Sequence, residues 1–417
     1  MEDWKPYKLE EVCKKVISGG TPLTSKKEYY MNGNIPWLKT TEVNKEIIYS
    51  IDTFITAEGL KNSSAKLIPA NSIIVAMYGD GGTAGKAALT KIPLSTNQAC
   101  CNLIINETKA DFGFIYYYLK VNYENLVNLK SGGSQQNLNA LTIRKFPIIL
   151  PSINIQQRIS SIISAYDELI ETNNQRIKLL EVTSRELYRE WFVRLRFPEY
   201  NNTKFVKGIP EGWEVKPILS LCSRITDGTH DTPKPLQEGI PLITGKHLID
   251  GRIDFETAYK ISLEDHEKIK KRSGLVKGDI LFSNIGTIGS TAVVYEDFEY
   301  SVKNVIIFKP ALSQYSLFLY YMILSEGVKE QMLMDAFGTS QQFISLGYIR
   351  KLKTIIPAKN LIFRFSEIVA PMFEQIQNLQ QQNTHLRQIR DRLLPRLISG
   401  KLQVKFDKIL LNSKTEN

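Results

Sequence analysis

Hydrophobic residues recur at steps of three and four through one long stretch near the middle of the chain, Ile153–Arg194. The stretch begins after Pro151, and no Gly or Pro interrupts it before Pro198. This spacing places the apolar side chains on one face of an amphipathic helix. At ~1.5 Å per residue, roughly 40 residues predict a rod of about 60 Å, which is too long for one small domain to cover.

A second stretch with the same periodicity lies between Pro357 and Gly400. We expect the two helices to pair, because they occupy equivalent places in a repeated chain; two independent surface helices are the alternative. Asn173 and Asn383 both fall on the apolar stripe, where a buried Asn fixes the register of a helix pair. The predicted helix-pairing residues are Ile159, Ile162, Tyr166, Leu169, Asn173, Ile177, Leu180, Phe365, Met372, Ile376, Leu379, Asn383 and Leu386.

The first 150 residues contain short apolar runs separated by Gly, Pro and Asn. Runs such as Ser72–Met77 and Cys100–Ile105 predict strands in a mixed, strand-rich domain. A helix is predicted at Phe112–Leu129, where the apolar residues fall on roughly one face.

The second half of the chain repeats the plan of the first. Gly82-Thr83-Ala84-Gly85 is echoed by Gly286-Thr287-Ile288-Gly289, and Ser134-Gln135-Gln136 by Ser340-Gln341-Gln342. The two Ser-Gln-Gln segments are separated by 206 residues (340 − 134 = 206). The prolines before the two helices are separated by the same number (357 − 151 = 206). We therefore predict an α+β fold in which two strand-rich globular domains are joined by two long antiparallel coiled-coil helices, with a pseudo-twofold internal repeat. The predicted segments are domain 1 at 1–150, a central helical spacer at 151–196, domain 2 at 205–356, a distal helical spacer at 357–402 and a tail at 403–417.

Composition narrows the class of protein. A chain of 417 residues predicts two domains, and the net charge of +10 is spread diffusely, so it permits a polyanionic partner without requiring one. The four cysteines show no CxxC spacing, which argues against a zinc site and a disulfide framework and favours a reducing compartment. No apolar run approaches ~18 residues and no signal peptide is evident, so the sequence predicts a cytoplasmic protein with no membrane partner.

The Gly-rich loop Tyr78–Ala87 is the strongest candidate for chemistry. A Walker A loop requires Gly and Ser or Thr at the positions that hold Asp80 and Ala87, so a nucleotide-binding loop is not predicted. A tight turn between strands is the simplest alternative. A third interpretation is that the glycines let the backbone and the hydroxyl of Thr83 or Thr287 approach a phosphate or base edge. The histidines are scattered, and no catalytic residue, metal site or cofactor is predicted in this chain.

The repeated Ser- and Gln-rich segments suggest binding instead. A Gln side chain presents a donor and an acceptor together and can read adenine, although these residues could equally cap the helix that follows. Basic residues beside donors in other predicted loops are weaker candidates. The candidate DNA-binding residues are Lys26, Lys27, Tyr29, Lys39, Tyr78, Thr83, Lys86, Lys130, Ser134, Gln135, Gln136, His230, Lys234, Lys246, His247, Asn284, Thr287, Lys303, Thr339, Ser340, Gln341 and Gln342.

The repeated plan and three local segments resemble the specificity subunits of type I restriction-modification systems. The segments are Pro151-Ser152-Ile153-Asn154-Ile155-Gln156-Gln157-Arg158-Ile159, Leu187-Tyr188-Arg189-Glu190-Trp191-Phe192-Val193 and Leu393-Leu394-Pro395-Arg396-Leu397-Ile398-Ser399-Gly400-Lys401. The resemblance covers essentially the whole chain. One departure is that Lys359–Phe365 replaces the Gln-Gln-Arg-Ile run at the start of the second helix.

The resemblance implies a non-catalytic subunit in which each globular domain reads one half of a split sequence in double-stranded DNA. The helices would set the gap between the half-sites and dock two methyltransferase subunits. Those partners would carry S-adenosylmethionine, while ATP and magnesium would belong to restriction subunits; whether two restriction subunits join is left open. A coiled-coil scaffold whose domains bind protein is the alternative function.

Overall fold

The computed structural model describes residues 4–79, 82–130, 137–286, 288–334 and 343–404. The chain divides into two compact units, each combining a strand-rich domain with segments of two long helices. Unit 1 comprises Met1–Thr172 and Asn383–Asn417, and unit 2 comprises Asn173–Gln382. Within the described residues, no helix has both the length and the hydropathy that a membrane span requires.

Unit 1 is built on a five-stranded sheet with the order β2-β10-β7-β8-β4. Its neighbours pair antiparallel, except that β4 runs parallel to β8. The strands are β2 (Cys13–Ser18), β4 (Ile47–Ile48), β7 (Ile73–Ala76), β8 (Ala87–Thr90) and β10 (Cys100–Ile105). A second sheet has the order β5-β3-β9-β6, formed by Phe54–Ile55, Ile35–Leu38, Leu94–Thr96 and Leu67–Ile68. A ribbon of β1 (Lys5–Lys8) and β11 (Pro147–Leu150) completes the strands.

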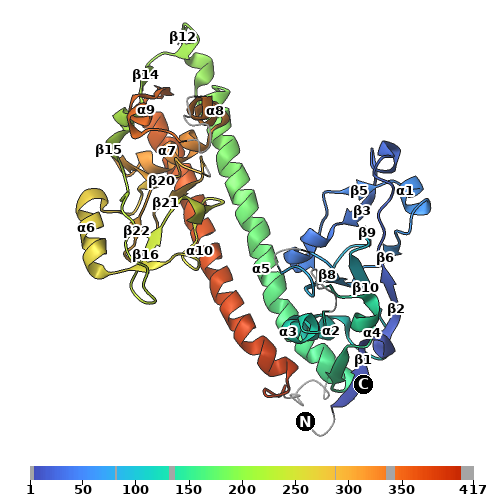
Figure 1. Ribbon diagram of the computed structural model, residues 1–417. Coiled ribbons are helices and arrows are strands. Elements are labelled where there is room, and N and C mark those ends of the chain that lie inside the picture. The colour runs from blue at the N-terminus through green and yellow to red at the C-terminus, as the bar shows by residue number, and fades with distance from the viewer. Residues whose placement is uncertain (1–3, 80–81, 131–136, 287, 335–342, 405–417) are drawn as a thin grey trace, which may run out of the picture. The chain divides into compact units, whose positions relative to one another are not determined.

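Helix α2 (Phe112–Val121) packs between the five-stranded sheet and the first part of α5 (Ile153–Tyr188) (Figure 1). One core cluster joins these elements, because Leu103 of the sheet, Phe114 of α2 and Ile163 of α5 are all buried in it. The predicted helix at Phe112–Leu129 is broken at Asn122, where α2 ends before α3 (Tyr123–Val127) begins. The Asn122 side chain donates to the Tyr118 carbonyl, which also accepts the last backbone hydrogen bond of α2 from the Asn122 N–H. The short helices α1 (Ala57–Lys61) and α4 (Ala140–Arg144) lie elsewhere in the unit.

Unit 2 has a four-stranded antiparallel sheet with the order β15-β23-β20-β21 and a three-stranded sheet with the order β19-β16-β22. The strands of the first are Cys222–Asp227, Ile306–Pro310, Ile280–Phe282 and Thr291–Val293. Those of the second are Lys260–Ile261, Ile240–Ile243 and Ser301–Val302. Paired ribbons are formed by β12 (Phe205–Val206) with β13 (Ile209–Pro210), β14 (Glu214–Pro217) with β24 (Lys353–Ile356), and β17 (Leu248–Ile249) with β18 (Arg252–Ile253). The helices are α6 (Leu263–Ser273), α7 (Tyr315–Leu324), α8 (Glu326–Met334) and α9 (Leu346–Lys351).

The strand topology of unit 1 recurs in unit 2, which confirms the predicted internal repeat. The order β2-β10-β7-β8 corresponds to β15-β23-β20-β21, and the parallel pair β3-β9 corresponds to the parallel pair β16-β22. The ribbon β1-β11 likewise corresponds to β14-β24. Helix α10 (Lys359–Ile398) begins 206 residues after α5 (359 − 153 = 206), so the repeat holds even where the sequence departs at the start of the second helix.

The two long helices run antiparallel within each unit, as the sequence predicted. In unit 1 the early residue Asp167 of α5 pairs with the late residue Arg390 of α10. In unit 2 the order is reversed, because Tyr188 at the end of α5 has its ring centroid 5.9 Å from that of Phe365 near the start of α10. A π-helical turn, Arg189–Val193, extends α5.

The buried stripe of α5 differs from the predicted one over two turns in unit 1. Ile163, Asp167 and Ile170 are buried, whereas Leu169 is 48% exposed. Placing Leu169 on the buried face was therefore wrong, and Ile162 and Tyr166 are only partly buried. The reason is that a charged residue occupies the stripe: Asp167 is buried because both its oxygens are bound, Oδ1 by Arg390 at 2.5 Å and Oδ2 by the Tyr117 hydroxyl at 2.6 Å.

Candidate nucleic-acid interface

The Gly-rich loop of unit 1 connects two antiparallel strands of the sheet, β7 and β8. The strand pairing continues into the loop, because the Ala76 N–H donates to the Lys86 carbonyl and the Gly85 N–H donates to the Ala76 carbonyl. Gly85 has φ +91°, a conformation that other residues rarely adopt. A strand rather than a helix follows Lys86, so this loop cannot present a helix N-terminus to a phosphate as a Walker A loop does.

Three polar side chains meet beside this loop. The ammonium of Lys86 donates to Asn44 Oδ1 at 2.9 Å, and Asn44 Nδ2 lies 3.4 Å from the hydroxyl of Thr83. Asn44 belongs to the 3-10 helix η3 (Thr40–Lys45), so a residue 39 positions away in the sequence holds the loop. Lys86 is exposed and Thr83 is buried. The sequence indicated Thr83 and Lys86 but not Asn44, because only the fold brings η3 to the loop.

The other basic candidates of unit 1 differ in exposure. Lys39 is exposed, with its ammonium 5.9 Å from the centre of the Trp37 ring. Lys26 donates to the hydroxyl of Tyr29 at 3.1 Å, and this hydrogen bond raises the pKa of Lys26. The Tyr29 ring itself is buried, so it does not offer a stacking surface. Lys27 lies in the short 3-10 helix η2 (Lys27–Tyr29).

A polar cluster lies at the end of β15 in unit 2. His230 Nδ1 lies 2.9 Å from Asn304 Oδ1, and His230 Nε2 lies 2.7 Å from Asp227 Oδ2. The other oxygen of Asp227 accepts a hydrogen bond from Arg272 at 2.7 Å. The neighbouring Lys303 donates to the hydroxyl of Thr232. The fold therefore brings together His230 and Lys303, which the sequence singled out, with four residues that it did not.

The two hydrogen bonds determine the protonation of Asp227. Burial alone would raise the pKa of this carboxyl, but the hydrogen bonds from Arg272 and His230 outweigh burial and lower the pKa below its usual value. Asp227 is thus a fixed acceptor that holds His230 and Arg272 in place, and the His230 ring remains exposed at the surface.

Asp227→Asn is expected to lower the free energy of unfolding of unit 2 by about 1–2 kcal/mol at neutral pH, since a charged acceptor is lost. Because the folded-state pKa lies below the ordinary value of 3.8, this stabilisation is present above about pH 4 and is lost as the pH falls further. The thermal midpoints of the wild type and the variant should therefore converge towards pH 3. Asp231→Asn, at an exposed neighbour, is the matched control; a constant difference at all pH values would contradict the assignment.

The equivalent position of unit 1 carries different chemistry. The Gly228 and Thr229 N–H groups donate to the carbonyls of Val305 and Val302, just as Gly19 and Gly20 donate to those of Cys100 and Thr96. By this correspondence His230 and Asn304 of unit 2 are equivalent to Thr21 and Gln98 of unit 1. Thr21 and Gln98 also contact each other. The same backbone frame thus presents an imidazole and an amide in one domain and a hydroxyl and an amide in the other.

The remaining candidates of unit 2 are less concentrated. Lys234 and Lys246 are exposed. His247 is fully buried, and its Nδ1 accepts a hydrogen bond from the Thr244 N–H at 2.9 Å, so it supports the loop and does not face a ligand. Asn284 Nδ2 donates to the Ile344 carbonyl at 2.9 Å and fastens two loops together.

The Ser- and Gln-rich segments lie outside the described residues, but their neighbours do not. Leu138, which follows the first segment, donates through its N–H to the carbonyl of Met77, and Ile344 donates in the same way to Asn284. In both units, therefore, the chain leaves this segment beside the Gly-rich loop, next to the exposed Tyr78 in unit 1. Lys130, at the other side of the first segment, is partly buried. Ser134, Gln135, Gln136, Thr287, Thr339, Ser340, Gln341 and Gln342 are not described.

The cysteines offer no reactive thiolate. All four are unpaired thiols, and burial raises the pKa of Cys13, Cys100, Cys101 and Cys222 to about 12. At neutral pH they remain protonated and act as small apolar side chains.

Comparison with known proteins places both repeats in one family. The model of the type I restriction modification DNA specificity domain matches residues 1–182 and 210–387. The MjaIX type I restriction enzyme specificity subunit of Methanocaldococcus jannaschii is 28% identical over 422 residues, covering 97% of this chain and 94% of that one. The EcoR124I/EcoR124II specificity subunit of Escherichia coli is 32% identical over 198 residues, 47% of this chain and 48% of that one.

A solved structure shows the same fold. The crystal structure of the S subunit of a type I restriction-modification system from M. genitalium superimposes with a TM-score of 0.62. The alignment covers 97% of both chains at 17% sequence identity.

Proposed function

The chain belongs to the family of type I restriction-modification DNA specificity domains, which matches both repeats, and from this premise we propose how its two domains recognise DNA. Each domain reads one half of a bipartite target in double-stranded DNA. The observation that carries this proposal is that equivalent frames at the end of β2 and β15 present Thr21 and Gln98 in one domain but His230 and Asn304 in the other. Because the backbone is similar in the two domains while the hydrogen-bonding side chains differ, the domains suit two half-sites of different sequence.

The division of labour within each domain follows from the chemistry of DNA. Exposed ammonium groups such as those of Lys86 and Lys39 suit phosphates, which position a protein without specifying sequence. Amide, imidazole and hydroxyl groups suit base edges in the major groove. Two linked domains bind far more tightly than either does alone only when their separation matches that of the half-sites.

The partner subunits that we propose also rest on membership of this family. The curated relatives are specificity subunits, so the chain itself is not proposed to catalyse a reaction. The paired helices α5 and α10 would dock two methyltransferase subunits that bind S-adenosylmethionine and methylate adenine. Restriction subunits that use ATP and magnesium would join the same complex in the cytoplasm. A scaffold whose domains bind protein is not favoured, because the family match spans both domains.

The decisive experiment is co-expression with the cognate methyltransferase, followed by mapping of methylated adenines in the host genome. Replacing residues 1–150 with the corresponding domain of a relative should change one half of the methylated motif, and replacing residues 205–356 should change the other half. Methylation that is independent of both exchanges, or no association with the methyltransferase, would refute the proposal and favour the scaffold.

Lys86→Gln is expected to weaken DNA binding by a similar factor for target and non-target sequences. The plot of log affinity against log salt concentration should become less steep by about 0.9, since one phosphate contact is lost. Fluorescence anisotropy of the assembled complex at several salt concentrations measures both quantities. Lys61→Gln removes an exposed lysine from α1 and serves as the control. A loss confined to the target sequence would show instead that Lys86 reads a base.

A further inference from the structure

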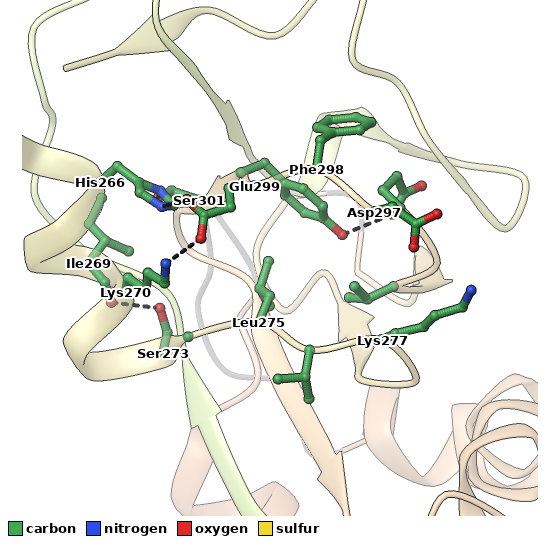
Figure 2. Close-up of a pocket in the computed structure, with 15 residues that line it drawn as sticks. His266, Ile269, Lys270, Ser273, Leu275, Lys277, Asp297, Phe298, Glu299 and Ser301 are labelled. Atoms are coloured by element: carbon green, nitrogen blue, oxygen red, sulfur yellow. Dashed lines mark hydrogen bonds and ion pairs between the residues drawn. The ribbon is translucent and has the colours of Figure 1, made fainter. Parts of the chain in front are cut away.

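In unit 2 the fold brings together three side chains that can ligate a metal ion, His266, Glu267 and Glu299, and the first and last of these also line a pocket. The first two belong to α6, and Glu299 lies in the loop before β22. The pocket has a volume of about 190 Å³, and none of the residues that line it belongs to the polar cluster around His230. Figure 2 shows the His266 ring and the Glu299 carboxylate side by side at one end of the pocket.

His266 is held in a single orientation. The residue is 2% exposed, and its Nδ1 lies 2.9 Å from the hydroxyl of Ser301, which is itself buried. This contact turns Nε2 towards Glu299, whose Oε2 lies 3.3 Å away. Among the described residues Nε2 nevertheless makes no hydrogen bond of acceptable geometry. A buried ring nitrogen whose nearest partner is this long contact with Glu299 is incompletely satisfied, so a closer partner would stabilise it.

The separation of the two atoms fits a shared metal ion. Zinc binds imidazole nitrogen and carboxylate oxygen at about 2.0–2.2 Å, and in tetrahedral geometry this places the two ligand atoms roughly 3.3–3.5 Å apart. The observed 3.3 Å matches that spacing, and one atom from each of the three residues lies within 4.8 Å of the others. The contact between the Ser301 hydroxyl and Nδ1 holds the ring in place, as a hydrogen bond to the second ring nitrogen does in most metal-bound histidines.

Other interactions already engage part of the acidic charge around His266. Glu296, another acid of the pocket, already accepts hydrogen bonds from the hydroxyl of Tyr300 and the N–H of Tyr295. Lys270 pairs with Oε1 of Glu299 and lies 3.9 Å from Glu267. Its ammonium therefore neutralises part of the acidic charge and would compete with a cation.

We propose that His266, Glu267 and Glu299 form a binding site for a divalent transition-metal ion, for which zinc is the best match. One nitrogen and two carboxylate ligands favour zinc over magnesium or calcium, which prefer all-oxygen sites. A bound ion would join α6 to the loop that leads into β22. The sequence did not predict this site, because Glu299 lies 33 positions from His266 (299 − 266 = 33) and no recognised metal-binding spacing connects them.

The test is zinc titration of the untagged full-length chain after removal of metal with a chelator, followed by isothermal calorimetry. One equivalent should bind, and His266→Gln or Glu299→Gln should each weaken binding at least tenfold. Ser301→Ala should weaken it by roughly 10–100-fold, as loss of an outer-shell partner does. Lys270→Met should strengthen binding, because it removes the competing cation. Glu264→Gln, at an exposed acid of the same helix, should have no effect.

Cobalt substitution identifies the ligands. Intense visible bands without a thiolate charge-transfer band would support the site, whereas a thiolate band would assign the ion to cysteines and overturn the proposal. Circular dichroism shows whether His266→Gln folds, and the exposed Glu299 gives an independent variant if it does not. Failure of Lys270→Met to bind zinc more tightly than His266→Gln would also overturn the proposal. These outcomes do not depend on DNA recognition.

Discussion

Phe365→Ala is expected to lower the free energy of unfolding of unit 2 by about 4 kcal/mol, the largest effect we predict for an apolar residue. Phe365 is fully buried, and its ring contacts the rings of Tyr188, Trp191, Phe192, Phe318 and Tyr321. These partners come from α5, its π-helical extension and α7, so the ring joins both long helices to the domain. Removing the ring leaves a cavity among α5, its π-helical extension, α7 and α10. These four elements would all have to move to fill it.

Hydrogen exchange is the suitable measurement, because a chain with two units need not unfold in one step. Amides of α7 and the start of α10 should exchange much faster in the variant. Ile368→Ala, at a partly exposed position one turn further along the same helix, should change exchange little. Equal effects of the two substitutions would mean that the aromatic cluster does not hold the unit together.

Asp167→Ala is expected to lower the free energy of unfolding of unit 1 by about 3 kcal/mol, because it leaves Arg390 with only one carboxylate partner in a largely buried position. The remaining partner is the exposed Asp391 at 2.9 Å, which keeps the loss at the lower end of the usual range. The variant also removes the acceptor of the Tyr117 hydroxyl. Burial, reinforced by the carboxylate, raises the pKa of Tyr117, so this hydroxyl remains a donor at neutral pH.

A double substitution separates the ion pair from the space that it fills. Asp167→Leu combined with Arg390→Met should recover much of the stability lost in Asp167→Ala, since apolar side chains of similar size can replace a buried ion pair. Glu168→Ala, at the exposed neighbouring residue, is the control for helix propensity. If the double variant were less stable than Asp167→Ala, the ion pair would be contributing more than the helices' apolar contacts.

The equivalent position of unit 2 holds no such ion pair. The repeat offset places Phe373 where unit 1 has Asp167 (167 + 206 = 373), and its ring lies 6.3 Å from that of Tyr320. One repeat therefore uses a buried charge and the other an aromatic ring at the same junction between domain and helix. We infer that the charged version limits which residues of α5 and α10 can pair, since a shift by one residue would leave Asp167 or Arg390 without its partner.

This ion pair also explains where prediction from the sequence failed. The periodicity located both helices to within a few residues, because steps of three and four over some 40 residues have no other simple interpretation. It misplaced two turns of the buried face, because an Asp in a stripe of apolar residues is ordinarily assigned to solvent. Only the positions of Tyr117 and Arg390, 50 and 223 residues away, make its burial tolerable.

The amino-acid sequence by itself determined the domain order, the two long helices, the internal repeat and the family, because each of these depends on patterns that are local or are repeated at a constant offset. The tertiary structure decided which polar side chains meet: Asn44 with Lys86, Asp227 with His230 and Arg272, and His266 with Glu299. These contacts join residues on separate loops and strands. Their proximity depends on strand pairing and helix packing, and no spacing along the chain records it.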